Sequence, residues 1–295
     1  MTSAAPLLDP ARTWLADQIR SRVIGDEPDT KSAEVMLTPG PRWFAEGSVI
    51  REVHSDAAMF IGGLRALLLQ SLHPLAMAGV AEHSDYRADP WGRLQRTADY
   101  LAATTFGPVP MAEQAIATVK RVHTHVVGVA PDGRPYSAND PHLLGWVHVA
   151  EMDSFLAAHQ RYGTRRLPAA DVDAYLADCA LVAERLGVID PPRTAGELRR
   201  RLQEYRPELR GTRAARDSAR FLLLEPPLPL AARAPYTMLA GAAASLLPVW
   251  ARWPLRLPIF PVSEAMLVKP AGSVVTQLIR WSLHAGTAPH RHRAP

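Results

Sequence analysis

Apolar residues recur at intervals of three and four along most of this chain. One example is the segment 175–186, and another is Leu94 and Leu101 with Ala98 between them. Such spacing places apolar side chains on one face of a helix, whereas a half-buried strand needs strict alternation, which we do not find. The pattern therefore predicts an all-α protein.

Helix boundaries are marked by recurring local signals. An aspartate followed by proline supplies an N-cap carboxylate and a first helical residue, and it occurs at Asp9-Pro10, Asp89-Pro90, Asp140-Pro141 and Asp190-Pro191. A Thr-x-x-Glu capping box adds a start near residue 195. Helix ends are expected at Gly25, Gly107-Pro108, Gly128, Gly163, Gly187 and Pro207. We expect loops at 26–40, 129–140 and 224–235.

The first of three helices with candidate chemistry is predicted from about Val49 to Ser71. It is apolar nearly all round, which is typical of a central helix. Gly62 and Gly63 lie in its middle, where each costs about 1 kcal/mol in helix propensity. Either a tight helix–helix contact or a flat ligand lying against the missing side chains would explain the pair.

The second helix is predicted from Asp89 to about Thr105. Arg93 and Thr97 are four residues apart, so they lie one above the other on one face. A guanidinium and a hydroxyl in one column can bind a carboxylate. The alternative is a surface arginine with a threonine bonded to its own helix backbone.

The third helix is predicted from about Met111 to Val127. Its apolar face includes Ile116 and His123, whereas His125 falls on the polar face. A buried imidazole needs partners for both ring nitrogens. An iron atom on one nitrogen and a hydrogen-bond acceptor on the other would provide them, and so would ordinary core partners.

His73 lies in a Leu-His-Pro segment at the end of the first predicted helix. We expect it to cap a helix or to bond a group in a pocket, rather than to ligate a metal. His142 and His148 flank Trp146 and are expected to be structural or pocket-lining.

Length and composition favour one large helical domain. The chain has 295 residues, of which 47% are hydrophobic, and no change in composition calls for a second core. We predict an N-terminal helix and linker over residues 1–39, the helical domain over 40–285 and a disordered tail over 286–295.

The net charge and the cysteine content argue against a nucleic-acid partner and against an internal disulfide. The net charge is only +4, and the arginines are dispersed along predicted helices, so nucleic acid is not an expected partner. The single Cys179 excludes an internal disulfide.

No signal peptide is visible at the N-terminus, and we expect a cytoplasmic location. The apolar segments 57–81 and 235–250 are interrupted, so no spanning helix is expected, whereas peripheral membrane contact of 235–260 stays open.

Three segments in order carry a resemblance to a known family. They are GGLRALLLQSLHPLAMAGVAEHSDYRADPWGRLQRTADYLAATTFG, then RVHTHVVG, then PYSANDPHLLGWVH. Together they resemble the haem-dependent oxygenase family that includes the fungal MpaB enzymes and the bacterial latex-clearing rubber oxygenases, over roughly residues 40–255. The resemblance implies a globin-like helical domain with a buried pocket for one haem b. It implies His123 as the proximal iron ligand, and it places Arg93 and Thr97, which match the family's Arg-x-x-x-Thr motif, at that pocket.

The sequence departs from the rubber-cleaving members at two points. They carry a lysine just before the threonine, where this chain has Arg96, a side chain that stays protonated and is a poor ligand. Their distal carboxylate base has no secure counterpart, since Glu82 and Asp85 are nearby but offset. Rubber cleavage is therefore not carried over to this chain.

The functional prediction is a haem b-dependent oxygenase that uses dioxygen to oxidise a small apolar, unsaturated substrate, with cleavage of a C=C bond as the candidate reaction. His123 would bind the iron, Arg93 and Thr97 would serve cofactor binding and catalysis, and His73 would also serve cofactor binding. The alternatives are a haem or hydrophobic-ligand binder without turnover, and a helical interaction protein without a cofactor.

Overall fold

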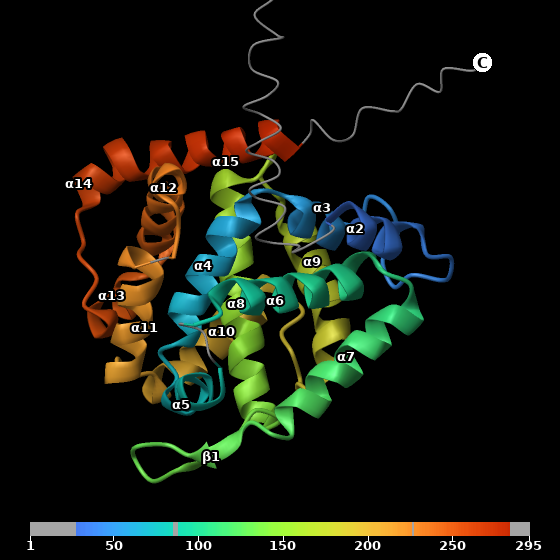
Figure 1. Ribbon diagram of the computed structural model, residues 1–295, viewed down its shortest axis with the longest axis horizontal. Helices are drawn as coiled ribbons and strands as arrows, with labels where there is room; N and C mark the ends of the chain where they lie inside the picture. The colour runs from blue at the N-terminus through green and yellow to red at the C-terminus, as the bar shows by residue number, and fades with distance from the viewer. Residues whose placement is uncertain (1–27, 85–87, 226, 284–295) are drawn as a thin grey trace, which may run out of the picture.

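The computed structural model describes residues 28–84, 88–225 and 227–283. The predicted start at Asp9-Pro10, the stop at Gly25, Asp85 and the tail from residue 286 lie outside the described residues. The described chain is helical nearly throughout (Figure 1), which confirms the all-α prediction.

The helices and strands follow one another in a simple order. The helices are α2 (Pro28–Leu37), α3 (Val49–Ser55), α4 (Ala58–Gln70), α5 (Pro74–His83), α6 (Pro90–Phe106), α7 (Val109–His123), α8 (Pro141–Tyr162), α9 (Ala169–Leu186), α10 (Ala195–Tyr205), α11 (Arg213–Leu224), α12 (Leu230–Leu246), α13 (Val249–Leu255), α14 (Pro261–Ser263) and α15 (Lys269–Leu283). Two strands form one hairpin, β1 (Val127–Val129) and β2 (Pro135–Ser137). A 3₁₀ turn, η1 (Arg206–Glu208), follows α10, and a π-helical turn, η2 (Glu264–Val268), precedes α15.

The helices α4 and α8 form the centre of the molecule, with α12 on one side and α9 on the other (Figure 1). They run antiparallel, because Gly62 of α4 packs on Phe155 of α8 while Gln70 reaches Glu151. The core around them buries Trp146 and Tyr175 completely. The predicted apolar helix around residue 60 is therefore central.

A buried arginine fixes the central pair to α12. The Arg65 guanidinium donates to the Asp153 carboxylate at 2.7 Å, to the Ser154 hydroxyl at 2.7 Å and to the Leu246 carbonyl at 3.1 Å. A buried charge is tolerated when it is paired and hydrogen-bonded in this way. The arginine that interrupts the apolar segment 57–81 thus connects three helices.

The predicted single helix from Val49 to Ser71 is wrong, because the chain breaks between α3 and α4. The buried Asp56 carboxylate accepts hydrogen bonds from the backbone N–H groups of Ala58 (2.7 Å) and Thr164 (3.1 Å) and pairs with Arg280 at 2.6 Å. Two of these partners are distant in sequence, so helical periodicity could not reveal the break.

Three of the predicted helix starts are confirmed by their caps. Asp89 accepts from the Gly92 N–H at 2.8 Å, Asp140 from the His142 N–H at 2.8 Å, and Thr194 from the Glu197 N–H at 3.2 Å. The start at Asp190-Pro191 is wrong. Asp190 has φ of 47°, and the helix begins only at Ala195. Pro192 follows Pro191 and disfavours helical backbone there.

Helix ends at Gly107, Gly163 and Gly187 are confirmed, and α10 ends before Pro207. The stop at Gly128 is wrong, because α7 ends at His123 and residues 127–129 form β1.

The three predicted loops contain regular structure. In the hairpin, Val127 pairs with Ser137 and Val129 with Pro135, because the valine-rich run favours strand. Strands thus occupy part of the loop predicted at 129–140, α2 lies in the loop predicted at 26–40, and α12 begins at Leu230 within the one predicted at 224–235.

Among the helices of the described ranges, none is by itself long and apolar enough to cross a membrane. Within the described ranges one pair, α4 and α5 taken together, meets that test, and these two helices are bent by 107°. In the stretch 235–260, Trp253 is 73% exposed and Phe260 is 62% exposed. Peripheral membrane contact of this stretch stays a prediction.

Candidate functional site

The two glycines of α4 have different surroundings. A Cβ atom on Gly62 would lie 3.1 Å from Cδ1 and 3.3 Å from Cα of Phe155, so this glycine allows α4 to approach α8. A Cβ atom on Gly63 would meet no atom within 4 Å. Gly62 therefore serves the helix–helix contact, and open space lies against α4 at Gly63.

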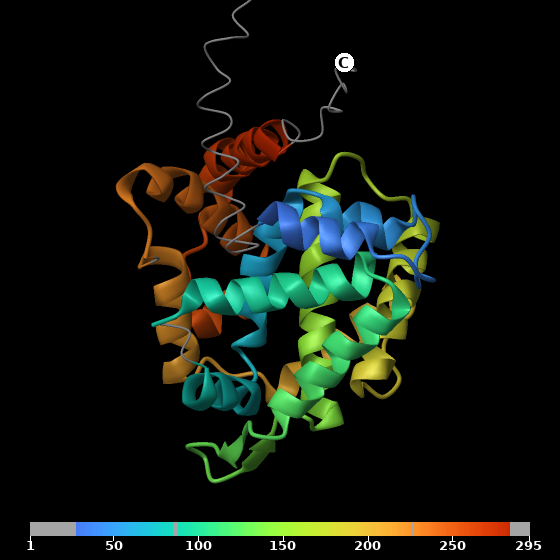
Figure 2. The ribbon, with the colours of Figure 1, turned by 45° about the vertical axis from the view of Figure 1, so that its right-hand side comes forward.

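Helices α6 and α7 contact other helices more than they contact α4 and α8. Helix α6 packs on α2, α3 and α7, and α7 packs on α6 and α9. In the described part of the chain neither packs along α4 or α8 to a comparable extent, although α6 crosses in front of both (Figure 2). The helices α6 and α7 diverge from the turn at Gly107 in both ribbon views.

Polar side chains line the inner surface between α4, α6 and α8. The Gln70 amide donates to the Glu151 carboxylate at 3.2 Å. Burial raises the pKa of Glu151 to about 7, against the smaller opposite effect of that hydrogen bond. Burial, with a smaller effect of the Glu151 charge, also raises the pKa of Tyr100 on α6. Glu151 therefore faces α6 and can exchange a proton near neutral pH.

His148 lies one turn before Glu151 on the same face of α8. Its side chain is 7% exposed, and its buried Nε2 atom has no hydrogen-bond partner among the described residues. Burial lowers the pKa of His148 to about 4. The ring is therefore neutral at physiological pH and retains an unused nitrogen.

A further buried polar group joins α3, α6 and α9. His54 pairs through Nδ1 with the Thr105 hydroxyl at 2.8 Å and through Nε2 with the Tyr175 hydroxyl at 3.1 Å. Burial lowers the pKa of His54 to about 4. Sequence reasoning missed His54 and Glu151. The one available signal for Glu151 was its position three residues after His148 in an apolar helix.

His123 is the last residue of α7 and is half-buried. Its Nδ1 atom is buried and has no hydrogen-bond partner among the described residues. Burial lowers the pKa of His123, and a side-chain hydrogen bond with Asn139 partly opposes this effect. His123 therefore packs against the loop before α8, whereas Glu151 lies about 15 Å further along that helix.

His125 differs from its neighbour, as the helical spacing predicted. It is exposed, and its Nδ1 atom lies 3.1 Å from the Arg121 carbonyl and 3.2 Å from the Thr124 hydroxyl. The ring is thus bonded to the end of its own helix, and it is a suitable control for substitutions of His123.

Arg93 and Thr97 share one face of α6, as predicted. The Thr97 hydroxyl is exposed and donates to the Arg93 carbonyl at 3.0 Å, whereas the Arg93 guanidinium donates to the Ser84 hydroxyl at 3.1 Å. Arg96 is exposed and pairs with Asp89 at 3.4 Å. The roles of Arg93 and Thr97 at a haem stay predictions.

The predicted capping role of His73 is confirmed. Its Nδ1 atom accepts from the Ala76 N–H at the start of α5, and its Nε2 atom lies 3.3 Å from Glu208. Glu82 is exposed and accepts a short hydrogen bond from the Tyr136 hydroxyl on β2. This carboxylate therefore belongs to the hairpin contact.

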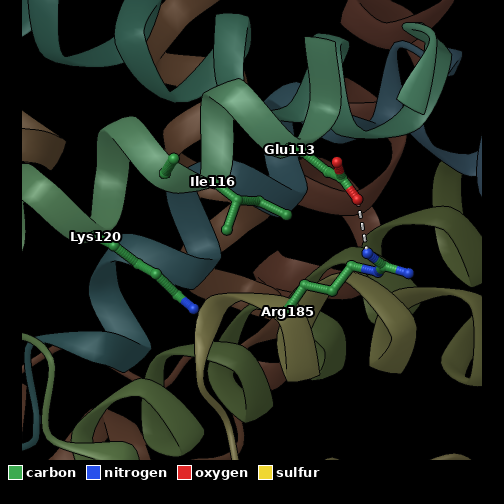
Figure 3. A pocket seen from close by; sticks show the side chains of 5 residues that line it. Glu113, Ile116, Lys120 and Arg185 are labelled. Atoms are coloured by element: carbon green, nitrogen blue, oxygen red, sulfur yellow. Dashed lines mark hydrogen bonds and ion pairs between the residues drawn. The ribbon is translucent and has the colours of Figure 1, made fainter. Parts of the chain in front are cut away.

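A surface hollow lies between α7 and α9 (Figure 3). It has a volume of about 260 Å³ and is lined by Glu113, Ile116, Ala117, Lys120 and Arg185. The Glu113 carboxylate and the Arg185 guanidinium pair across it at 3.0 Å. Ligand pockets are commonly larger, about 300–1,000 Å³, and mostly apolar. We therefore assign no ligand to this hollow.

Comparison with known proteins gives one result. The family described as ER-bound oxygenase mpaB/B′/rubber oxygenase, catalytic domain, matches residues 51–281. No curated protein and no solved structure gives a significant match. The family match covers well over half of the chain and includes all the helices from α4 to α14. The chain therefore belongs to the MpaB and rubber oxygenase family, and its function is that of an oxygenase.

Proposed function

We propose that this oxygenase depends on haem b and acts with dioxygen on a small apolar, unsaturated substrate. Family membership supports an oxygenase. The observation that carries the haem proposal is the buried Nδ1 atom of His123, which has no partner among the described residues. A buried polar atom left unpaired costs about 1–3 kcal/mol, which a bound cofactor would offset.

The residues present fit such a group in two respects. His123 has a lowered pKa and is therefore held in the neutral form that binds a metal. Helices α6 and α7 contact each other, α2, α3 and α9 more than they contact α4 and α8, so a flat group would enter between the two pairs of helices.

Haem, when bound, would supply the activation of dioxygen and the redox chemistry. The chain would hold the iron through His123 and position a propionate through the Arg93 guanidinium, with Thr97 beside it. Glu151 would hold or release a proton at its carboxylate, because its pKa is about 7. Leu101 and Met59, half-buried against the core, would keep the space apolar.

A haem or hydrophobic-ligand binder without turnover is the second candidate. It is favoured by Arg96, which is exposed, pairs with Asp89 and stays protonated, so it offers no distal ligand to iron.

Turnover under isotopically labelled dioxygen distinguishes the two candidates. The reduced, haem-loaded protein is given a set of apolar alkenes, and the products are analysed by mass spectrometry. We expect a product that contains the label. The Glu151→Gln variant is expected to lose at least about tenfold in rate with unchanged haem content.

Oxidation of the haem without any labelled product would contradict the oxygenase proposal and support the binder. Protein that takes up no haem under these conditions would contradict the haem-dependent oxygenase and the haem binder, and would leave only a binder of other hydrophobic ligands.

A further inference from the structure

Two histidines and one glutamate from three separate elements meet at the N-terminal end of α8. His73 is the N-cap residue of α5, His142 lies in the first turn of α8, and Glu208 ends the 3₁₀ turn η1. One ligand atom from each, the two imidazole nitrogens and a carboxylate oxygen, lie within 4.8 Å of one another.

The separations match those in a metal site. The Nε2 atom of His73 lies 3.3 Å from Oε2 of Glu208, and the Nε2 atom of His142 lies 2.9 Å from Oε1. Ligands about 2.0–2.2 Å from a tetrahedral zinc ion lie about 3.4 Å apart. An ion placed between these atoms would therefore require only small side-chain movements.

Aromatic packing holds the two imidazole rings in place. The His73 ring lies 6.2 Å from Trp146, and the His142 ring lies 4.8 Å from Tyr205. Tyr205 also donates its hydroxyl hydrogen to the His142 carbonyl at 2.9 Å. Ligands with fixed orientation bind a metal with a smaller loss of entropy.

The local charges suit a divalent cation. Glu208 supplies a carboxylate oxygen, and each imidazole binds a metal ion in its neutral form. The nearby positive charge of Arg134 is paired with Asp132 at 2.8 Å.

Metal binding would replace the contacts of both imidazoles with Glu208 and would also change the hydrogen bond between His73 and Ala76. The Nδ1 atom of His73 accepts from the Ala76 N–H, so Nε2 carries the proton in the metal-free protein. Coordination through Nε2 would move that proton to Nδ1. The Nδ1–H group and the Ala76 N–H would then face each other as two donors, so the His73 ring would have to turn slightly away from Ala76; the bond given up is 3.5 Å long, at the limit for a hydrogen bond.

We propose that His73, His142 and Glu208 form a binding site for a divalent transition-metal ion of the zinc class. Two imidazoles and one carboxylate are a ligand set found in zinc sites, with water in the fourth position. That position opens to solvent, because the side chains of His142 and Glu208 are 53% and 35% exposed. The ion would join α5, the start of α8 and η1, separately from the haem proposed above.

Equilibrium dialysis with Zn²⁺ tests the site in the full-length protein after treatment with a chelator. We compare the wild type with Glu208→Gln and His142→Gln, both at partly exposed positions. His125→Gln is the matched control, because it removes an exposed histidine outside the cluster. Cobalt absorption reports the coordination geometry, and the melting temperature reports linkage to folding.

We expect one Zn²⁺ ion per chain in the wild type and in His125→Gln, with tetrahedral cobalt bands and a raised melting temperature. Glu208→Gln and His142→Gln should weaken zinc binding at least about tenfold and lose the cobalt bands. Haem uptake should be the same in all four proteins.

Three results would overturn the proposal. They are absence of zinc binding by the wild type, equal binding by Glu208→Gln, and loss of haem together with zinc in His142→Gln, which would show that the two sites are not separate.

Discussion

The histidines of this protein differ in what their ring nitrogens contact. His54 uses both nitrogens on Thr105 and Tyr175, whereas His123 and His148 each retain a buried nitrogen with no partner among the described residues. Helical spacing was enough to separate His123 from His125, because it depends only on local geometry. It could not identify the partners of His54, since Tyr175 is 121 residues away.

At the residue scale, we predict that Cys179 does not react in the folded protein. Its side chain is 4% exposed, and burial raises its thiol pKa far above the ordinary value, so little thiolate forms. Labelling with a thiol reagent should be negligible in buffer and complete, at one thiol per chain, in denaturant. Rapid labelling of the folded protein would contradict the packing around α9.

At the scale of single elements, local signals located helix starts well and helix breaks poorly. The caps at Asp89, Asp140 and Thr194 involve backbone N–H groups two or three residues away, so the sequence contains the whole motif. The break at Asp56 depends on Thr164 and Arg280, which only the fold brings near. The helix start predicted at Asp190 does not form for a local reason, because Pro192 follows Pro191 and disfavours helical backbone there.

The glycine pair of α4 gives a matched prediction. Gly62→Ala should destabilise the protein by about 1–3 kcal/mol, because the new methyl group would press on Phe155, including its backbone Cα atom at 3.3 Å. Gly63→Ala adds the same group where nothing lies within 4 Å, so it should stabilise the cofactor-free protein by up to about 1 kcal/mol through helix propensity.

Urea unfolding of the two cofactor-free variants measures both effects. Equal changes in the free energy of unfolding would contradict the asymmetry of this helix.

At the scale of the whole molecule, the helical class and the central position of α4 were predictable from periodicity alone. The placement of α6 and α7 was not, since these helices diverge from the turn at Gly107 and pack on α2, α3 and α9, which are distant in sequence (Figure 2). Polar side chains on α6 and α8 lie inside this arrangement, and burial changes the pKa values of Glu151 and His148 in opposite directions.

These shifts predict how stability depends on pH. The pKa of His148 falls from 6.5 to about 4 on folding. Below pH 6.5 the unfolded chain therefore binds a proton that the folded chain does not, and stability decreases as pH falls toward 4. Each such group contributes a slope of up to about 1.4 kcal/mol per pH unit.

Glu151 acts in the opposite sense. Its pKa rises from 4.5 to about 7 on folding, so its stabilising contribution is complete below pH 4.5 and is lost as pH rises through 7. Urea unfolding at a series of pH values gives the free energy of unfolding against pH. Compared with the wild type, this free energy should rise less steeply with pH in His148→Gln and more steeply in Glu151→Gln. Identical slopes in both variants and the wild type would contradict this interpretation.

The absorption spectrum of the haem-loaded protein tests the central claim most directly. Because we place the iron on His123, His123→Ala should lose or strongly shift the Soret band, whereas His125→Ala and His148→Ala should keep the wild-type spectrum. A wild-type Soret band in His123→Ala, or its loss only in His148→Ala, would contradict the proposal.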